Sequence, residues 1–304
     1  MLELGLGAQE VFAAGATGKL AAVFSKAAYL RLPTGLVALT TWAAPPGPIH
    51  ARGHFPLHRF AAGDTVTVDL SRARVWEGTA LTPAALAAGA GTVLDVLAGA
   101  PASALADPVF EPRRASALQC LERGDLDGAV DLLAGLGPGL TPAGDDALAG
   151  ILLVHGAHDR AAAIAAADRA KTNDIARAFL AWAARGQSIE PVHRLLAAGD
   201  RGQAAAALAD LLRFGHSSGS DLAFGLQLGL RDRLQRRCEP QVSLHVRAMA
   251  VQPTWSMLSA STSRDEWRRS LEQDDVRPTS RSRLRLPFRQ DRPGAPRPPV
   301  ARGG

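Results

Sequence analysis

The chain has 304 residues, a formal net charge of +5, 47% hydrophobic residues and only two cysteines. This is enough apolar chain to bury a sizeable core, and two cysteines without CxxC or Cys/His spacing argue against a disulfide framework and a structural zinc site. The apolar runs are broken well before the ~20 residues that a membrane helix needs. The N-terminal segment carries Glu3 and Glu10 and no early basic residue, unlike a signal peptide. We therefore expect a cytoplasmic protein with no membrane contact.

The positive charge is concentrated near the C-terminus. Residues 231–304 hold 16 Arg, no Lys and eight acidic residues, so this part carries +8 and residues 1–230 carry −3. Residues 1–230 contain no run of basic and aromatic residues, and we expect no nucleic-acid binding there. Residues 237–304, rich in Arg, Pro and Ser, are predicted to form a mostly disordered tail. Contact of this tail with an anion or a nucleic acid is the alternative.

The composition and pattern of residues 1–80 predict a β-rich subdomain. The runs 22–32, 35–42 and 65–70 are rich in Val, Leu, Thr and aromatic residues, and TVTVDL alternates as a half-buried strand does. Turn signals such as Pro33-Thr34-Gly35 separate these runs. The pattern predicts a small antiparallel sheet or open barrel.

Residues 81–236 are rich in Ala and Leu at helical spacing and form the second predicted subdomain. Thr82 is a typical N-cap, followed by Pro83 at the first helical position. Helices are expected at 83–97, 112–123, 125–134, 142–155, 159–170, 173–185, 190–198, 201–213 and 219–236. Five glycines are expected to end helices: Gly124, Gly135, Gly156, Gly186 and Gly199. The predicted fold class is α+β, with the small sheet packed on the larger helical region that carries the motifs described next.

The segment GLGPGLTPAGDD at 135–146 is the strongest candidate for a functional site. Its glycines let a ligand approach the main chain, and Thr141-Pro142 predicts an N-cap and a first helical residue. The free amides and the positive dipole end of such a helix start attract anions. Asp145 and Asp146 are able to cap the helix, to accept hydrogen bonds from an amide or ammonium group, or to ligate magnesium. Capping alone is the structural alternative. The segment lacks the Lys of a Walker A loop.

A second segment repeats this pattern 75 residues later. TPAGDDALAGILL (141–153) aligns with HSSGSDLAFGLQL (216–228), and both read G-x-D-x-x-x-G. The repeat predicts two similar helix starts that face one cleft; coincidence and packing glycines are the alternatives. His216 is a candidate general acid/base or anion donor, or a structural histidine. Ser217 and Ser218 offer hydroxyl donors to an anion, or serve as N-caps.

These two motifs resemble a bacterial family, one branch of which is the AllH-type subunit of oxamate carbamoyltransferase from anaerobic allantoin (purine) breakdown. The motifs that carry the resemblance are GLGPGLTPAGDDALAG and FGHSSGSDLAFGLQLGL, with support from residues 23–40 and 172–186. The resemblance covers residues 20–232. It implies a subunit that helps to move a carbamoyl group between oxalurate or oxamate and phosphate. Implied partners are these small anions, carbamoyl phosphate and other protein subunits.

The resemblance and the chemistry of the motifs define the expected site. The residues expected to bind the substrate are Gly137, Gly139, Thr141, Gly144, Ser217, Ser218 and Gly219. Those expected to be catalytic are Asp145, Asp146, His216 and Asp221. Basic residues that the fold could bring to a phosphate are Arg113, Arg114, Lys171, Arg177 and Arg213. No cofactor is firmly implied. The alternatives are a non-catalytic anion-binding or partner subunit, and a phosphoryl-transfer enzyme in which the three aspartates hold Mg²⁺.

Overall fold

The computed structural model describes residues 1–238. The predicted α+β class is confirmed: an N-terminal sheet is followed by a mostly helical region. The tail predicted from residue 237 lies outside the described residues from residue 239 onward, and the two residues before it belong to the last helix.

The N-terminal sheet has seven strands in the order β6-β2-β3-β4-β5-β1-β7. Its strands are β1 (Leu2–Gly5), β2 (Thr17–Val23), β3 (Ala27–Leu32), β4 (Gly35–Thr40), β5 (His50–Arg52), β6 (Thr65–Thr67) and β7 (Ala73–Trp76). The predicted antiparallel pairing holds for β6-β2-β3-β4, whereas β4 with β5 and β1 with β7 pair in parallel. Neither parallel pair is joined by a tight hairpin, because residues 41–49 connect β4 to β5, and β1 and β7 are distant in sequence.

Five N-terminal elements differ from the sequence-based prediction. The run 22–32 is not one strand, because it holds the end of β2, a turn and β3. Helix α1 (Leu6–Phe12) and the strands β1, β5 and β7 were not predicted. These elements have three to seven residues, too few to display a period, and their burial comes from packing against strands that are distant in sequence.

The helical region follows the predicted order closely. Its helices are α2 (Pro83–Leu97), α3 (Glu111–Arg123), α4 (Leu126–Leu133), α5 (Ala143–His158), α6 (Arg160–Arg169), α7 (Asp174–Ala184), α8 (Glu190–Leu196), α9 (Arg201–Leu212) and α10 (Ser218–Cys238). Short 3₁₀ turns occupy 57–59, 104–106 and 108–110. Thr82 caps α2 as predicted, because its side chain accepts a hydrogen bond from the Ala85 amide at 3.2 Å. Gly156, by contrast, does not end α5. It lies inside the helix, where an added Cβ would come 2.3 Å from the Ala184 carbonyl oxygen of α7.

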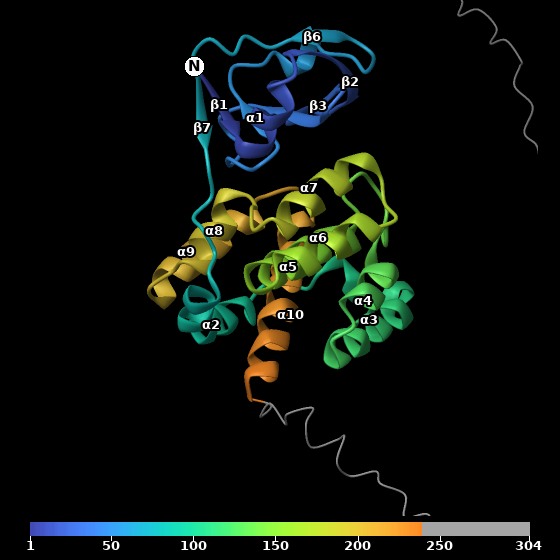
Figure 1. Ribbon diagram of the computed structural model, residues 1–304, viewed down its shortest axis with the longest axis vertical. Helices are drawn as coiled ribbons and strands as arrows, with labels where there is room; N and C mark the ends of the chain where they lie inside the picture. Colours follow the sequence, from blue (N-terminus) through green and yellow to red (C-terminus); the bar gives the residue numbers. More distant parts are fainter. Residues whose placement is uncertain (239–304) are drawn as a thin grey trace, which may run out of the picture. The chain divides into compact units, whose positions relative to one another are not determined.

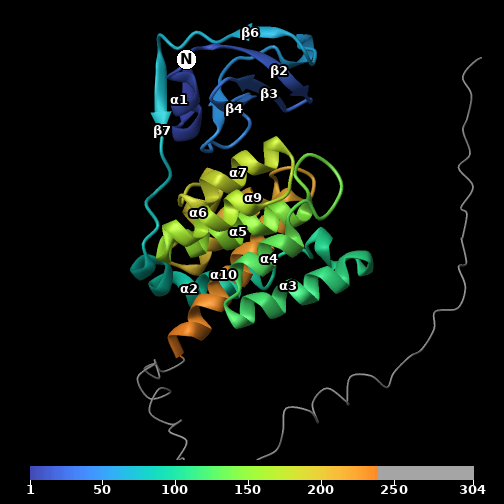
Figure 2. The same ribbon diagram turned by 45° about the vertical axis from the view of Figure 1, so that its right-hand side comes forward.

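Helices α5 and α10 form the centre of the helical region and cross each other (Figures 1 and 2). The crossing is a direct approach of two backbones at Gly150 and Gly225. A Cβ on Gly150 would lie 2.4 Å from the Leu226 amide nitrogen, and a Cβ on Gly225 would lie 1.9 Å from the Ala147 carbonyl oxygen. Figure 1 shows α3 and α4 on one side of this pair and α8 and α9 on the other.

Helix α7 joins the sheet to the helical core. Ile175 of α7 packs with Leu36, Ala38 and Ile49 of the sheet region in one buried cluster. At the surface, Arg31 of β3 pairs with Asp174 at 2.7 Å.

Among the described residues, no helix combines the length and hydropathy required to cross a membrane.

Candidate functional site

The first motif starts α5 one residue later than predicted. The helix begins at Ala143, with Pro142 as its N-cap and without a side-chain capping hydrogen bond. Thr141 was predicted to be the cap, but its hydroxyl instead lies 3.2 Å from the hydroxyl of Ser218 in the second motif. The two motifs therefore meet through the side chains of Thr141 and Ser218, which are 77 residues apart in the sequence.

The main-chain amides at the two helix starts are largely engaged within the chain. Gly135, Gly137 and Gly139 adopt positive φ values of 68°, 115° and 94°, which fold the loop back over the start of α5. As a result, the Gly144 amide donates to the Leu136 carbonyl at 2.8 Å. In the second motif, the Gly219 amide donates to the Phe214 carbonyl at 3.0 Å. The main-chain amides that were predicted to bind an anion at the two helix starts are therefore partly occupied by carbonyl oxygens of the preceding loops.

Asp145 ties two loops to the start of α5. Its side chain is 3% exposed, and it accepts hydrogen bonds from the Gly135 amide at 2.9 Å and the Thr172 hydroxyl at 2.5 Å. Burial raises the pKa of Asp145, while the hydrogen bonds from Thr172 and Gly135 lower it. Both oxygens of this carboxylate accept hydrogen bonds from the surrounding loops, so its contacts are structural.

Asp221 makes a similar connection from α10. It is fully buried, and its Oδ1 accepts from the Ser103 hydroxyl at 2.6 Å and the Ala104 amide at 2.7 Å. Its Oδ2 is also buried but has no hydrogen-bond partner. An unsatisfied buried carboxylate oxygen is costly, so this atom is a candidate acceptor for a donor supplied by a ligand.

Asp146 faces the second motif. Its Oδ2 is buried without a hydrogen-bond partner. Burial raises the pKa of Asp146 well above its ordinary value, a hydrogen bond with Ser218 acts in the opposite direction, and the charges of Asp221 and Asp145 raise it further. Burial and the charge of Asp146 also raise the pKa of Tyr29, on β3, to about 12. Two aspartates at equivalent positions of the motifs thus lie within electrostatic reach of each other, and each has one unpartnered oxygen.

The remaining predicted site residues are less involved. His216 and Gly139 are exposed, and Gly137 is partly buried, where an added Cβ would lie 3.0 Å from the Ala143 amide nitrogen. Ser217 accepts hydrogen bonds at its carbonyl from the Ser220 hydroxyl and the Asp221 amide. Gly144 and Gly219 are buried where a side chain would strike a neighbouring carbonyl. Among the described residues, no three His, Cys, Asp or Glu side chains are grouped as metal ligands.

Three side chains that contact the motif aspartates, or interact with them, were not predicted. Ser103 and Thr172 donate to Asp221 and Asp145, and Tyr29 lies within electrostatic reach of Asp146. None of them belongs to a motif, and each is brought in from a segment distant in sequence. Thr172 could have been found from the sequence by its position, because its hydroxyl lies directly before Asn173, the N-cap residue of α7.

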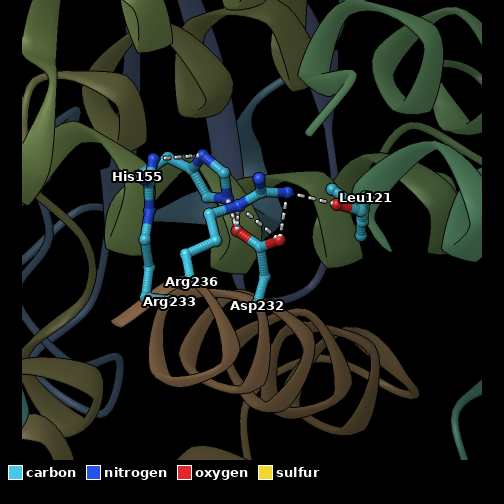
Figure 3. A network of polar contacts seen from close by, with 5 residues as sticks. All are labelled: Leu121, His155, Asp232, Arg233 and Arg236. Atoms are coloured by element: carbon cyan, nitrogen blue, oxygen red, sulfur yellow. Dashed lines mark hydrogen bonds and ion pairs between the residues drawn. The ribbon is translucent and has the colours of Figure 1, made fainter. Parts of the chain in front are cut away.

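A second polar network lies beyond the glycine crossing (Figure 3). Arg233 donates to Nδ1 of His155 at 2.7 Å, and Nε2 of His155 lies 3.2 Å from Asp232. Because a guanidinium only donates, Nδ1 is unprotonated and the neutral ring carries its proton on Nε2, facing Asp232. Arg236 bonds to both Asp232 and the Leu121 carbonyl of α3. The network therefore links α5, α10 and α3.

Two surface cavities, of about 490 and 510 Å³, are lined by residues outside the motifs. The first lies beside Trp76, Glu190 and His193, and the second beside Met1 and His54. Both ring nitrogens of His193 are engaged by main-chain groups at 3.0 Å, which indicates a structural histidine.

Fold and site together define an α+β protein with two crossed helices whose adjacent starts carry two aspartates, each with a buried oxygen that has no hydrogen-bond partner. Residues 133–230, which include both motifs, match the model of the family described as oxamate carbamoyltransferase subunit AllH. The AllH-like resemblance predicted from the sequence is therefore confirmed over this range. No solved structure matches the chain.

Proposed function

We propose that this chain is a cytoplasmic subunit of an oxamate carbamoyltransferase-like enzyme of allantoin breakdown. In this proposal, the starts of α5 and α10 bind the amide end of a small amide-carboxylate such as oxamate or oxalurate. The observation that carries it is the pair of buried, unpartnered oxygens, Asp146 Oδ2 and Asp221 Oδ2. A buried acceptor without a donor costs about 1–3 kcal/mol, and a primary amide brings two N–H donors. The AllH match supports the choice of substrate class.

Arg177 is the basic residue that we propose for the negative end of the substrate. Its Nη2 donates to the Thr172 carbonyl at 3.0 Å, and Thr172 in turn bonds to Asp145 at the start of α5. Arg213 and Arg114 are instead paired with Asp210 and Glu111. A guanidinium near this position would neutralise a carboxylate or phosphate through charge-assisted hydrogen bonds.

The second candidate function is a non-catalytic subunit that binds the same ligand and leaves the chemistry to a partner. Two observations favour it: Asp221 has no exposed surface, and the two surface cavities are lined by residues outside the motifs. A partner subunit would then complete the site, and the chain by itself would show binding without turnover.

A comparison of oxamate with oxalate tests the binding site directly. The two molecules share a carboxylate, but oxamate has an NH₂ group where oxalate has a second charged oxygen. Two carboxylates that await donors should reject oxalate, because like charges would face each other. We expect calorimetry on the full chain to give an affinity for oxamate at least about a hundredfold higher than for oxalate. Equal affinities, or no binding of oxamate, would contradict the proposed site.

Turnover separates the two candidate functions. The chain, purified with the subunits that copurify with it, is assayed for conversion of oxalurate and phosphate to oxamate and carbamoyl phosphate. Activity that is lost in Asp146→Asn while the complex stays assembled supports a catalytic site in this chain. Activity that is retained in this variant supports the non-catalytic subunit. No turnover by the assembled complex would remove the carbamoyltransferase assignment.

A further inference from the structure

The two motifs belong to a longer internal duplication. Residues 121–153 align with residues 196–228 without a gap, and eleven of the 33 aligned pairs are identical. The helix starts follow the same spacing of 75 residues. Helix α4 begins at Leu126 and α9 at Arg201, while α5 begins at Ala143 and α10 at Ser218. The chain therefore contains two copies of one helical unit, α4–α5 and α9–α10.

Specific contacts are repeated in the two units. Asp125 caps α4 by accepting from the amide three residues later at 2.8 Å, and Asp200 caps α9 in the same way at the same distance. The central helices also meet reciprocally: Gly150 of α5 approaches Leu222 of α10, and Gly225 of α10 approaches Ala147, the residue equivalent to Leu222. These contacts relate the two units by an approximate two-fold axis at the glycine crossing.

The duplication provides an internal comparison for the motif aspartates. Each unit uses one aspartate in the first turn of its central helix to bind a hydroxyl and a main-chain amide. In the second unit this residue is Asp221, with Ser103 and Ala104. In the first unit it is Asp145, with Thr172 and Gly135. The structural contacts at the start of the central helix are therefore already made by Asp145 in the first unit and by Asp221 in the second.

Asp146 is the additional carboxylate. It aligns with Asp221 in the sequence repeat, but the structural contacts of the first unit are made by its neighbour Asp145. We propose that Asp146 is the carboxylate kept for the ligand, that Asp221 holds a fixed oxygen beside it, and that Asp145 has a purely structural role. This assignment deepens the proposed function and rests on it for the identity of the ligand.

The physical signature of such a residue is a cost in stability. Asp146 has a buried, unpartnered oxygen and faces Asp145, Asp221, Ser218 and Tyr29, none of which is a cation. Because its pKa in the folded state is raised, ionisation of Asp146 destabilises the fold as the pH rises above its ordinary value of 3.8. A neutral isostere removes this penalty at Asp146, whereas the same change at Asp145 or Asp221 weakens the hydrogen bonds that these carboxylates accept from Thr172 and Gly135 or from Ser103 and Ala104.

Thermal unfolding of three isosteric variants of the full chain tests the assignment without any ligand. Asp146→Asn should unfold about 2–4 °C higher than the wild type near pH 8, and the gain should vanish near pH 4. Asp145→Asn and Asp221→Asn should unfold lower. In Asp145→Asn one of the two donors loses its acceptor oxygen, and in Asp221→Asn both donors face a neutral oxygen instead of a charged one. Should either variant fail to fold, Thr172→Val and Ser103→Ala remove one donor from each structural contact and should lower the midpoint by a smaller amount.

Calorimetry with oxamate provides the second measurement. Asp146→Asn should weaken binding at least tenfold, Asp221→Asn should weaken binding and stability together, and Asp145→Asn should change affinity less than about threefold. A wild type that does not bind oxamate overturns the proposed ligand but leaves the stability order as an independent test. An Asp146→Asn variant that unfolds lower than the wild type, or binds oxamate as the wild type does, overturns the assignment.

Discussion

Asp232 shows how single residues of this chain stabilise the fold through partners from other helices. Burial acts to raise the pKa of Asp232, but hydrogen bonds from His155 and Arg236 outweigh this and lower it to about 2. Burial is also the main cause of the lowered pKa of His155. The ring is therefore a neutral donor near pH 7, and Arg236 provides the positive charge beside Asp232 (Figure 3).

The pKa of Asp232 predicts a pH-dependent contribution to stability. A depressed carboxyl pKa stabilises the folded state above the unfolded value of 3.8, and this stability is lost as the pH falls toward 2. We expect Asp232→Asn to lower the free energy of unfolding by roughly 1–3 kcal/mol at pH 7. The difference should shrink as the pH falls below 4. Urea denaturation of both proteins across this range measures it.

Asp127 provides the matched control for this prediction. It pairs with Arg169 at 3.8 Å, but both side chains are about half exposed. Solvent-exposed pairs contribute little, so Asp127→Asn should change stability by less than about 1 kcal/mol. A loss in Asp232→Asn as small as that of the control would show that the network does not stabilise the fold.

At the scale of elements, the approach of α5 to α10 depends on two glycines. Replacement of Gly225 by alanine would place a Cβ 1.9 Å from the Ala147 carbonyl oxygen, and a backbone atom in a packed core cannot easily move. We expect Gly225→Ala to cost at least about 3 kcal/mol. Chemical denaturation monitored by circular dichroism gives this value.

Gly91 is the control at the same scale. It lies in α2, and nothing is within 4 Å of a Cβ built there. Alanine has the higher helix propensity, so Gly91→Ala should stabilise the protein by up to about 1 kcal/mol. If Gly225→Ala behaved like Gly91→Ala, the two helices would be farther apart than described.

At the scale of the whole molecule, the sheet and the helices share a buried cluster around α7. Ile175 is 6% exposed and packs against Leu36, Ala38 and Ile49. We expect Ile175→Ala to cost about 2–4 kcal/mol. Because the cluster belongs to both regions, the sheet and the helices of the variant should still unfold in one transition. Coincident urea curves from tryptophan fluorescence and far-ultraviolet circular dichroism would establish this.

Val109→Ala serves as the reference substitution for the shared cluster. Val109 is 71% exposed, so its truncation should change stability by less than about 0.5 kcal/mol. Separate fluorescence and circular dichroism transitions in Ile175→Ala would indicate that residues 1–80 and 81–236 unfold independently, as two subdomains would.

The sequence by itself determined helices α2 to α10, their order and the position of both motifs, because helical periodicity, caps and glycine stops are local signals. Short strands such as β5 carry too few residues for such a signal, and the tertiary structure alone decided their parallel pairing. The same holds for the candidate site. The motifs named the aspartates, but their different roles follow from Ser103, which reaches Asp221 across 118 residues, and Thr172, which reaches Asp145 across 27. Partners chosen by packing at such separations leave no periodic trace in the sequence.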